Sequence, residues 1–137
     1  MAGQIGIVIV AHGGLAREYL AAVEHVMGRQ TGMRFVTIED GCNRAAKQAE
    51  ICQVADSVDT GHGVVIVTDM FGGSPSNLAL RACFAPDRRI LYGANLPMLI
   101  KLTKSRHLSV PDAVKAGLQA GRKYIDAVDA ASLQAPE

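Results

Sequence analysis

The chain has 137 residues, of which 49% are apolar and 20% charged, and its formal net charge is +1. This length and composition are typical of one soluble globular domain with a substantial core. The balance of 14 basic against 13 acidic residues excludes the one-signed basic face that nucleic-acid binding requires, and no apolar run approaches the roughly 18 residues of a membrane span.

The three cysteines, Cys42, Cys52 and Cys83, form no C-x-x-C pair. An odd, widely spaced set is typical of reduced thiols that pack as small core residues. No secretory signal is visible at the N-terminus. We therefore expect a cytoplasmic protein.

A buried strand is predicted over residues 4–11, because the apolar run there is continuous, as in a parallel sheet. The strand leads into His12, Gly13 and Gly14. Apolar side chains then recur at helical spacing up to Gly28, a residue that favours a helix end. These side chains are Leu15, Tyr19, Leu20, Val23, Val26 and Met27.

Three more strands are predicted, over residues 33–38, 64–68 and 89–93. Residues that favour helix N-caps predict the starts of the remaining helices, at Asn43, Ser74, Asn95 and Ser109. Pro75 after Ser74 strengthens the second of these starts. We expect the first, third and fourth of these helices to run to about residues 58, 104 and 120, with Gly121 ending the last.

The C-terminal part carries a weaker pattern. Residues 123–129 alternate weakly, with Tyr124, Asp126 and Val128 on one side and Ile125 and Ala127 on the other, and predict a final strand; continuation of the preceding helix through residues 121–129 is the alternative. Residues 130–137 are mostly small and are expected to be a disordered tail. The predicted fold is α/β: one domain over residues 1–129, doubly wound, with a mainly parallel sheet and helices on both faces.

Three predicted strands are followed by polar residues, namely His12, Asp69 and Asn95. The carboxyl ends of parallel strands meet at one edge of a sheet, so we expect these side chains to converge. A carboxylate that accepts a hydrogen bond from one imidazole nitrogen fixes the tautomer. The other nitrogen is then free to act as a nucleophile or a metal ligand.

Glycines beside these residues favour a nucleophile with an anionic substrate. Gly13 and Gly14 let a ligand approach the backbone closely. Gly72, Gly73 and Ser74 precede a predicted helix, whose free N–H groups attract phosphate. We expect His12 and Asp69 to be catalytic, Gly13, Gly72, Gly73 and Ser74 to bind phosphate, and Asn95 to support the site.

Each of these residues also has a purely structural interpretation: a histidine at a strand end, a turn aspartate, a capping serine. Other chemistries fit less well. The chain has neither G-x-G-x-x-G after the first strand nor G-x-x-x-x-G-K-[ST], and residues 72–76 are not G-x-S-x-G. No second histidine lies at metal-ligand spacing from His12, so we expect no metal and no cofactor.

At these residues the chain resembles the IIA component of the mannose family of the bacterial phosphoenolpyruvate-dependent sugar phosphotransferase system. The resemblance is carried by residues 7–13 (IVIVAHG), 68–77 (TDMFGGSPSN) and 93–99 (GANLPML), in order and at matching spacing. It implies that His12 takes a phosphoryl group from phospho-HPr and passes it to a IIB component, supported by Asp69. The protein would contact the membrane only through a permease complex.

The resemblance also implies a homodimer whose last strand is exchanged between subunits, although this sequence matches the family least clearly there. A chain that ends at residues 130–137, without an Ala/Pro-rich linker, predicts a IIA component that stands alone. Three alternatives remain open at this point: a regulatory protein whose partner depends on the phosphohistidine, the phosphotransfer subunit of a dihydroxyacetone kinase, and a hydrolase that uses Ser74.

Overall fold

The computed structural model describes residues 3–70 and 87–134. Within them, four strands form one parallel sheet: β1 (Gly6–His12), β2 (Met33–Ile38), β3 (Val64–Thr68) and β4 (Arg88–Leu91). The order across the sheet is β2-β1-β3-β4. The chain therefore leaves β1 for β2 on one side and continues to β3 on the other side of β1. Open α/β sheets bind ligands at such a point, just beyond the carboxyl ends of the two strands, here β1 and β3.

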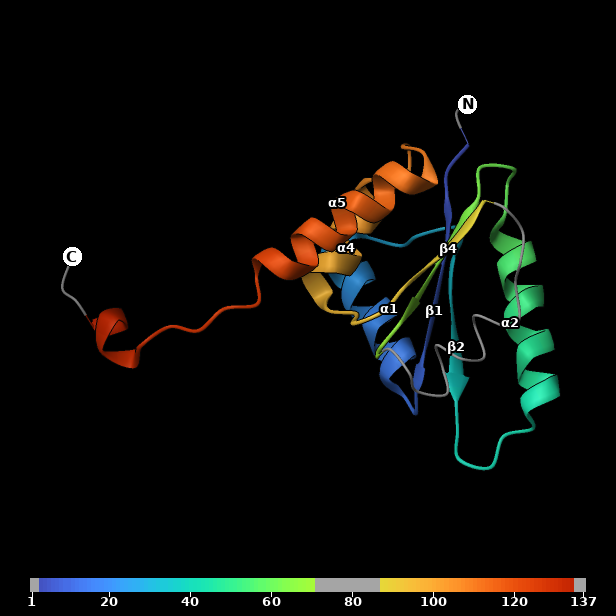
Figure 1. The fold of residues 1–137 in the computed structure, drawn as a ribbon, viewed down its shortest axis with the longest axis horizontal. Helices are drawn as coiled ribbons and strands as arrows, with labels where there is room; N and C mark the ends of the chain where they lie inside the picture. Colours follow the sequence, from blue (N-terminus) through green and yellow to red (C-terminus); the bar gives the residue numbers. More distant parts are fainter. Residues whose placement is uncertain (1–2, 71–86, 135–137) are drawn as a thin grey trace.

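Helices cover both faces of this sheet, as predicted (Figure 1). Helices α1 (Leu15–Met27), α4 (Leu96–Lys104) and α5 (Val110–Lys123) lie on one face, and α2 (Arg44–Val58) lies on the other. Alternate residues of β1 feed the two cores. Ile7 and Ile9 point toward α1 and α4, whereas Val8 and Val10 point toward α2, and all four are fully buried. Burial on both faces explains the continuous apolar run of this strand.

Side-chain caps start three of these helices, as the sequence predicts. The side-chain oxygens of Asn43, Asn95 and Ser109 accept hydrogen bonds from the backbone N–H three residues further on, over 2.9, 2.9 and 3.3 Å. Gly28, with φ +86°, follows the end of α1. The fourth strand begins at Arg88, one residue earlier than expected. It ends at Leu91, before the expected residue 93, because Gly93 has φ +80° and turns the chain toward α4.

The predicted end of α5 at Gly121 is wrong. The helix continues to Lys123, and Gly121 is a buried helical residue packed against Met98 of α4. A Cβ atom at position 121 would lie 3.2 Å from two side-chain carbons of Met98. The glycine therefore serves the close approach of two helices rather than a helix end.

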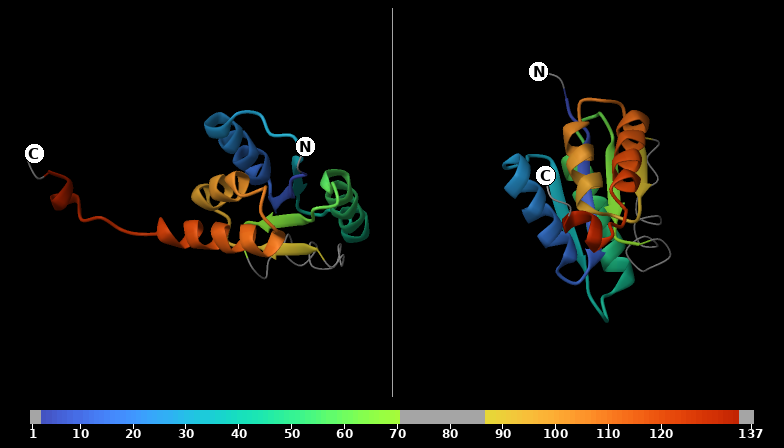
Figure 2. Two further views of the ribbon diagram at one scale, coloured as in Figure 1. Left: turned by 90° about the horizontal axis from the view of Figure 1, so that it is seen from above. Right: turned by 90° about the vertical axis from the view of Figure 1, so that its left-hand side faces the viewer.

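Residues 125–129 form no strand in the single chain, and the helix does not extend through them either. They lead away from the domain, as Figure 1 and the left view in Figure 2 show, and Ile125 and Val128 are 72% and 65% exposed. The tail expected to be disordered carries a short 3₁₀ helix, η1 (Ala130–Gln134). Residues 135–137, the last three of this tail, lie outside the described part of the chain.

Candidate active site

The structure brings His12 and Asp69 together at the carboxyl edge of the sheet. His12 is the last residue of β1, and Asp69 directly follows β3, the neighbouring strand. Oδ2 of Asp69 lies 2.7 Å from the ring Nδ1 of His12 and accepts a second hydrogen bond, of 3.1 Å, from its backbone N–H. Two contacts to one residue fix the imidazole against the carboxylate.

The carboxylate is itself held in place. Its Oδ1 accepts a 3.0 Å hydrogen bond from the backbone N–H of Met70, and only 11% of the Asp69 side chain is exposed. Burial alone would raise the pKa of Asp69, but hydrogen bonds from the ring and backbone of His12 outweigh it and hold this pKa below its ordinary value.

An ionised carboxylate can only accept hydrogen bonds, so Nδ1 of His12 carries the proton between the two groups. In the neutral imidazole with its proton on Nδ1, Nε2 holds the lone pair. The His12 side chain is 49% exposed, and no hydrogen-bond partner of Nε2 occurs among the described residues. Chemically, this arrangement presents a nucleophilic ring nitrogen to an incoming molecule.

The backbone after His12 leaves this approach open. Gly13 has φ +54°, and its N–H donates to the carbonyl of Ile38 over 2.9 Å. Gly14 is the N-cap of α1 and offers no side chain. Among the residues that the structure describes, a Cβ atom built on either glycine would meet nothing within 4 Å.

Asn95 uses both ends of its amide elsewhere. Its Oδ1 caps α4 at Met98, and its Nδ2 donates to the carbonyl of Gly121 over 3.0 Å. These bonds join the start of α4 to the end of α5 and do not reach His12. The other predicted phosphate-binding residues, Gly72, Gly73 and Ser74, lie outside the described residues.

Tyr19 approaches this edge of the sheet from α1, which the sequence did not indicate because the residue reads as one more member of an apolar stripe. Its hydroxyl donates to the carbonyl of Ala94 over 3.0 Å. Burial raises the pKa of Tyr19, and the nearby negative charge of Asp69 raises it further. The hydroxyl of a partly buried tyrosine needs a hydrogen-bond partner, and this requirement was the one indication in the sequence that Tyr19 contacts another segment.

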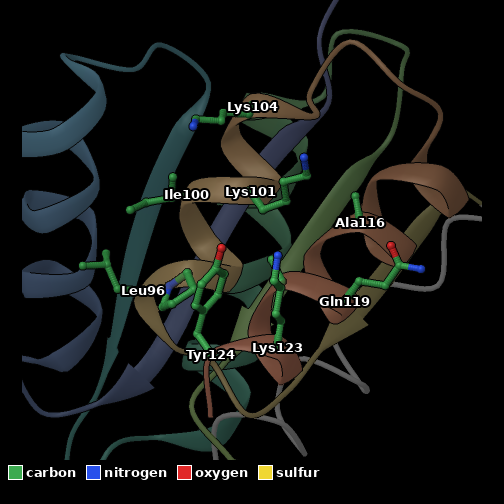
Figure 3. Close-up of a pocket in the computed structure, with 10 residues that line it drawn as sticks. Leu96, Ile100, Lys101, Lys104, Ala116, Gln119, Lys123 and Tyr124 are labelled. Carbon is green, nitrogen blue, oxygen red and sulfur yellow. The ribbon is translucent and has the colours of Figure 1, made fainter. Parts of the chain in front are cut away.

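A hollow of about 560 Å³ lies elsewhere, between α4 and α5 (Figure 3). Leu96, Ile100 and Tyr124 form apolar parts of its lining, and lysines stand at its rim. Neither His12 nor Asp69 lines it, so it is separate from the candidate site.

Two further properties concern the described residues only. They contain no group of three or more histidine, cysteine, aspartate or glutamate side chains placed to hold a metal ion. None of the helices described is both long and apolar enough to cross a membrane.

Comparison with known proteins identifies the family of this chain. The family model described as "PTS system fructose IIA component", of the EIIA-man type, matches residues 6–118, which include both His12 and Asp69. The chain belongs to this family. The resemblance to mannose-type IIA components of the sugar phosphotransferase system (PTS) is thereby confirmed, and PTS IIA components are phosphotransferases in general.

Curated relatives are similar over most of the chain. It is 29% identical over 129 residues to the "PTS system mannose-specific EIIAB component" of Escherichia coli K12, a match that covers 92% of this chain and 40% of that protein. It is 27% identical over 111 residues to the "PTS system fructose-specific EIIA component" of Bacillus subtilis, covering 79% of this chain and 75% of that one. The chain therefore spans about two fifths of the length of its mannose-specific relative.

Solved structures of PTS IIA proteins share the fold. The mannose/sorbose-specific IIA subunit from Enterococcus faecalis superposes with a TM-score of 0.83 at 24% identity, covering 98% of both chains. The EIIA component from Streptococcus agalactiae gives 0.80 at 25% identity, covering 94% of this chain and 99% of that one. The predicted α/β fold is confirmed.

Proposed function

We propose that this PTS IIA protein is a phosphocarrier that accepts a phosphoryl group on Nε2 of His12. One observation carries the proposal: Asp69 holds Nδ1 at 2.7 Å, which leaves Nε2 as the free nitrogen on a half-exposed side chain. A nitrogen that attacks phosphorus must be unprotonated, and its lone pair must be accessible to the incoming phosphoryl donor.

In the proposed step, the Nε2 lone pair forms a bond to phosphorus while the bond between phosphorus and the donor's histidine breaks. The bonding electrons return to the donor ring. The His12 ring gains positive charge as the bond forms, and the Asp69 carboxylate balances that charge through Nδ1–H. Positioning and charge stabilisation are most of what phosphoryl transfer requires.

The phosphoryl oxygens also need hydrogen-bond donors. We propose that the backbone N–H groups near Gly73 and Ser74, with Gly72, supply them, since the sequence places these residues shortly after Asp69 and before a predicted helix. Gly13 would contribute by leaving room for the group, because its own N–H is bonded to Ile38.

The proposed donor is phospho-HPr, and the proposed acceptor is a IIB component that serves sugar import or phosphorylation-dependent regulation. Family membership supports both partners, as does the EIIAB name of the Escherichia coli relative, in which IIA and IIB are named together. The proposal places the work of the protein in the cytoplasm, with the membrane reached only through a permease complex.

The test is transfer of labelled phosphate from phosphoenolpyruvate through enzyme I and HPr. We expect acid-labile, base-stable label on the wild-type protein and none on His12→Ala. His107→Ala is the matched control, because that histidine is also exposed and lies in a loop between α4 and α5. Label that persists in His12→Ala, or its absence from the wild type, would refute the proposal.

We also propose that the protein is a homodimer joined through its C-terminal segment. Ile125 and Val128 are largely exposed and no local strand pairs with them, while β4 forms an edge of the described sheet. A segment lent to a second copy would bury these side chains and could add a strand to the sheet. We expect sedimentation to give twice the chain mass of 14.5 kDa. A monomer at micromolar concentration, unchanged by truncation after Lys123, would remove this proposal.

A further inference from the structure

Tyr19 links α1, the helix that follows His12, to the turn that leads into α4. It lies in the second turn of α1, the helix that begins three residues after His12, and its ring packs against the core beneath that helix. Its hydroxyl crosses to the carbonyl of Ala94, on the turn that leads into α4, over 3.0 Å. The hydroxyl is thus bonded to a different part of the chain from the one its ring packs with.

Ala94 passes this contact on to the strand that carries Asp69. Its N–H donates to the carbonyl of Thr68 over 3.1 Å. Thr68 is the last residue of β3, is fully buried, and immediately precedes Asp69. Ala94 is therefore held on both sides, by the Tyr19 hydroxyl at its carbonyl and by the end of β3 at its N–H.

The turn that contains Ala94 has little freedom to move independently. Gly93 supplies the positive φ that the turn requires, and Asn95 fixes its far end to the start of α4 and to the end of α5. Loss of the Tyr19 contact would therefore release Ala94 from α1 while the helices on the other side stay in place. The strand end that carries Asp69 would lose this link to α1, while the pairing of Thr68 with Val10 of β1 remains.

This connection matters because the distance it maintains is short. A hydrogen bond of 2.7 Å between Nδ1 and Oδ2 weakens steeply when its partners separate or misalign. The Tyr19 hydroxyl also stays protonated, and so remains a donor, because burial and the charge of Asp69 both raise its pKa.

We propose that Tyr19 is a positioning residue for phosphoryl transfer, which acts through Ala94 and Thr68 to keep Asp69 against His12. The proposal rests on the proposed function for its rate effect, but the geometry of the pair can be measured without any transfer. Tyr19 touches neither the reacting nitrogen nor the phosphoryl group in this account.

The test compares Tyr19→Phe, which keeps the ring and removes the hydroxyl, with Tyr124→Phe, whose hydroxyl belongs to a largely exposed residue at the end of α5. We expect the rate constant for phosphorylation by phospho-HPr to fall about threefold to tenfold in Tyr19→Phe, the change that loss of one hydrogen bond produces. The control should match the wild type.

Two further readouts separate positioning from a general structural effect. In ¹⁵N spectra of the imidazole, Tyr19→Phe should show a larger share of the Nε2–H tautomer of His12 and faster exchange of the Nδ1 proton. In the Asp69→Asn background, removal of the Tyr19 hydroxyl should change the rate by less than about twofold, because residues that act through one another are not additive.

The outcomes are distinct. A wild-type protein that takes no phosphate on His12 refutes the proposed function, and the tautomer of His12 still decides whether Tyr19 positions the pair. An unchanged tautomer in Tyr19→Phe, or an equal slowing by this substitution whether residue 69 is aspartate or asparagine, would overturn the positioning role.

Discussion

Replacement of Asp69 by asparagine tests the role of the carboxylate with little change in shape. The asparagine oxygen can still accept from Nδ1 and from the backbone N–H of His12, the bonds of 2.7 and 3.1 Å in the structure. The negative charge is lost. The asparagine NH2 also replaces Oδ1, which accepts from the N–H of Met70, so an unchanged fold must be shown before a fall in rate is assigned to the lost charge.

The magnitude follows from two contributions. A hydrogen bond to a charged acceptor is worth about 1 kcal/mol more than one to a neutral acceptor. Loss of the attraction between the carboxylate and the positive ring adds about 1 kcal/mol, the value for charges about 4 Å apart in a water-like medium, which the 49% exposure of His12 makes appropriate. Together these predict a fall of roughly 10- to 100-fold in the rate constant for transfer.

The assay is single-turnover phosphorylation by phospho-HPr in a rapid-quench instrument, with circular dichroism to check the fold. Asp112→Asn, which removes an exposed carboxylate from the first turn of α5, serves as the matched control and should transfer at the wild-type rate. A rate for Asp69→Asn within about twofold of the wild type would show that the negative charge of Asp69 does not assist transfer.

Three further predictions concern stability. Asn95→Ala removes the cap of α4 and the bond to α5, so we expect the free energy of unfolding in urea to fall by about 1–2 kcal/mol. Arg106→Met should cost about 2–4 kcal/mol in the same assay, because this buried side chain donates to two backbone carbonyls; a loss under about 0.5 kcal/mol would contradict that role. Burial raises the pKa of Asp69, but hydrogen bonds from His12 outweigh burial and lower this pKa in the folded protein. Ionisation of Asp69 therefore stabilises the fold above about pH 4, and this stabilisation is lost as the pH falls through the lowered pKa of the folded state. The stability difference between wild type and Asp69→Asn should therefore shrink below about pH 4 in acid-unfolding measurements, and a difference that grows there would refute the sign.

The sheet could be predicted from the sequence because its strands are buried on both faces. The run that ends at His12 and the run at Val64–Thr68 are continuous apolar segments, which leave few alternatives once helical patterns separate them. The starts of helices at Asn43 and Asn95 followed from local capping chemistry, which depends only on residues within one turn.

The end of α5 could not be predicted in the same way. Glycine is a residue type that favours helix ends, but the role of Gly121 depends on Met98, which approaches it from another helix. Local patterns contain no information about such a contact. The weak alternation at residues 123–129 predicts a strand, yet alternation alone provides no neighbour to pair with, and none of the described strands pairs with this segment.

The contacts of the candidate site also differ in whether they could be predicted from the sequence. The pairing of His12 with Asp69 was accessible because the carboxyl ends of adjacent parallel strands must meet. The contact from Tyr19 was not, because it depends on where the Ala94 carbonyl lies relative to α1. Outside the site, the structural role of Arg106 was missed for a similar reason, since the carbonyls of Ile5 and Thr31 that accept its hydrogen bonds cannot be identified from side-chain patterns.

The most direct test of the central claim is the position of the phosphoryl group. The protein is labelled with ¹⁵N-histidine, phosphorylated through enzyme I and HPr, and examined by ³¹P and ¹⁵N NMR. The account predicts one phosphohistidine, at Nε2 of His12, with Nδ1 still protonated against Asp69. Phosphate on Nδ1 of His12, or on any other residue, would contradict it.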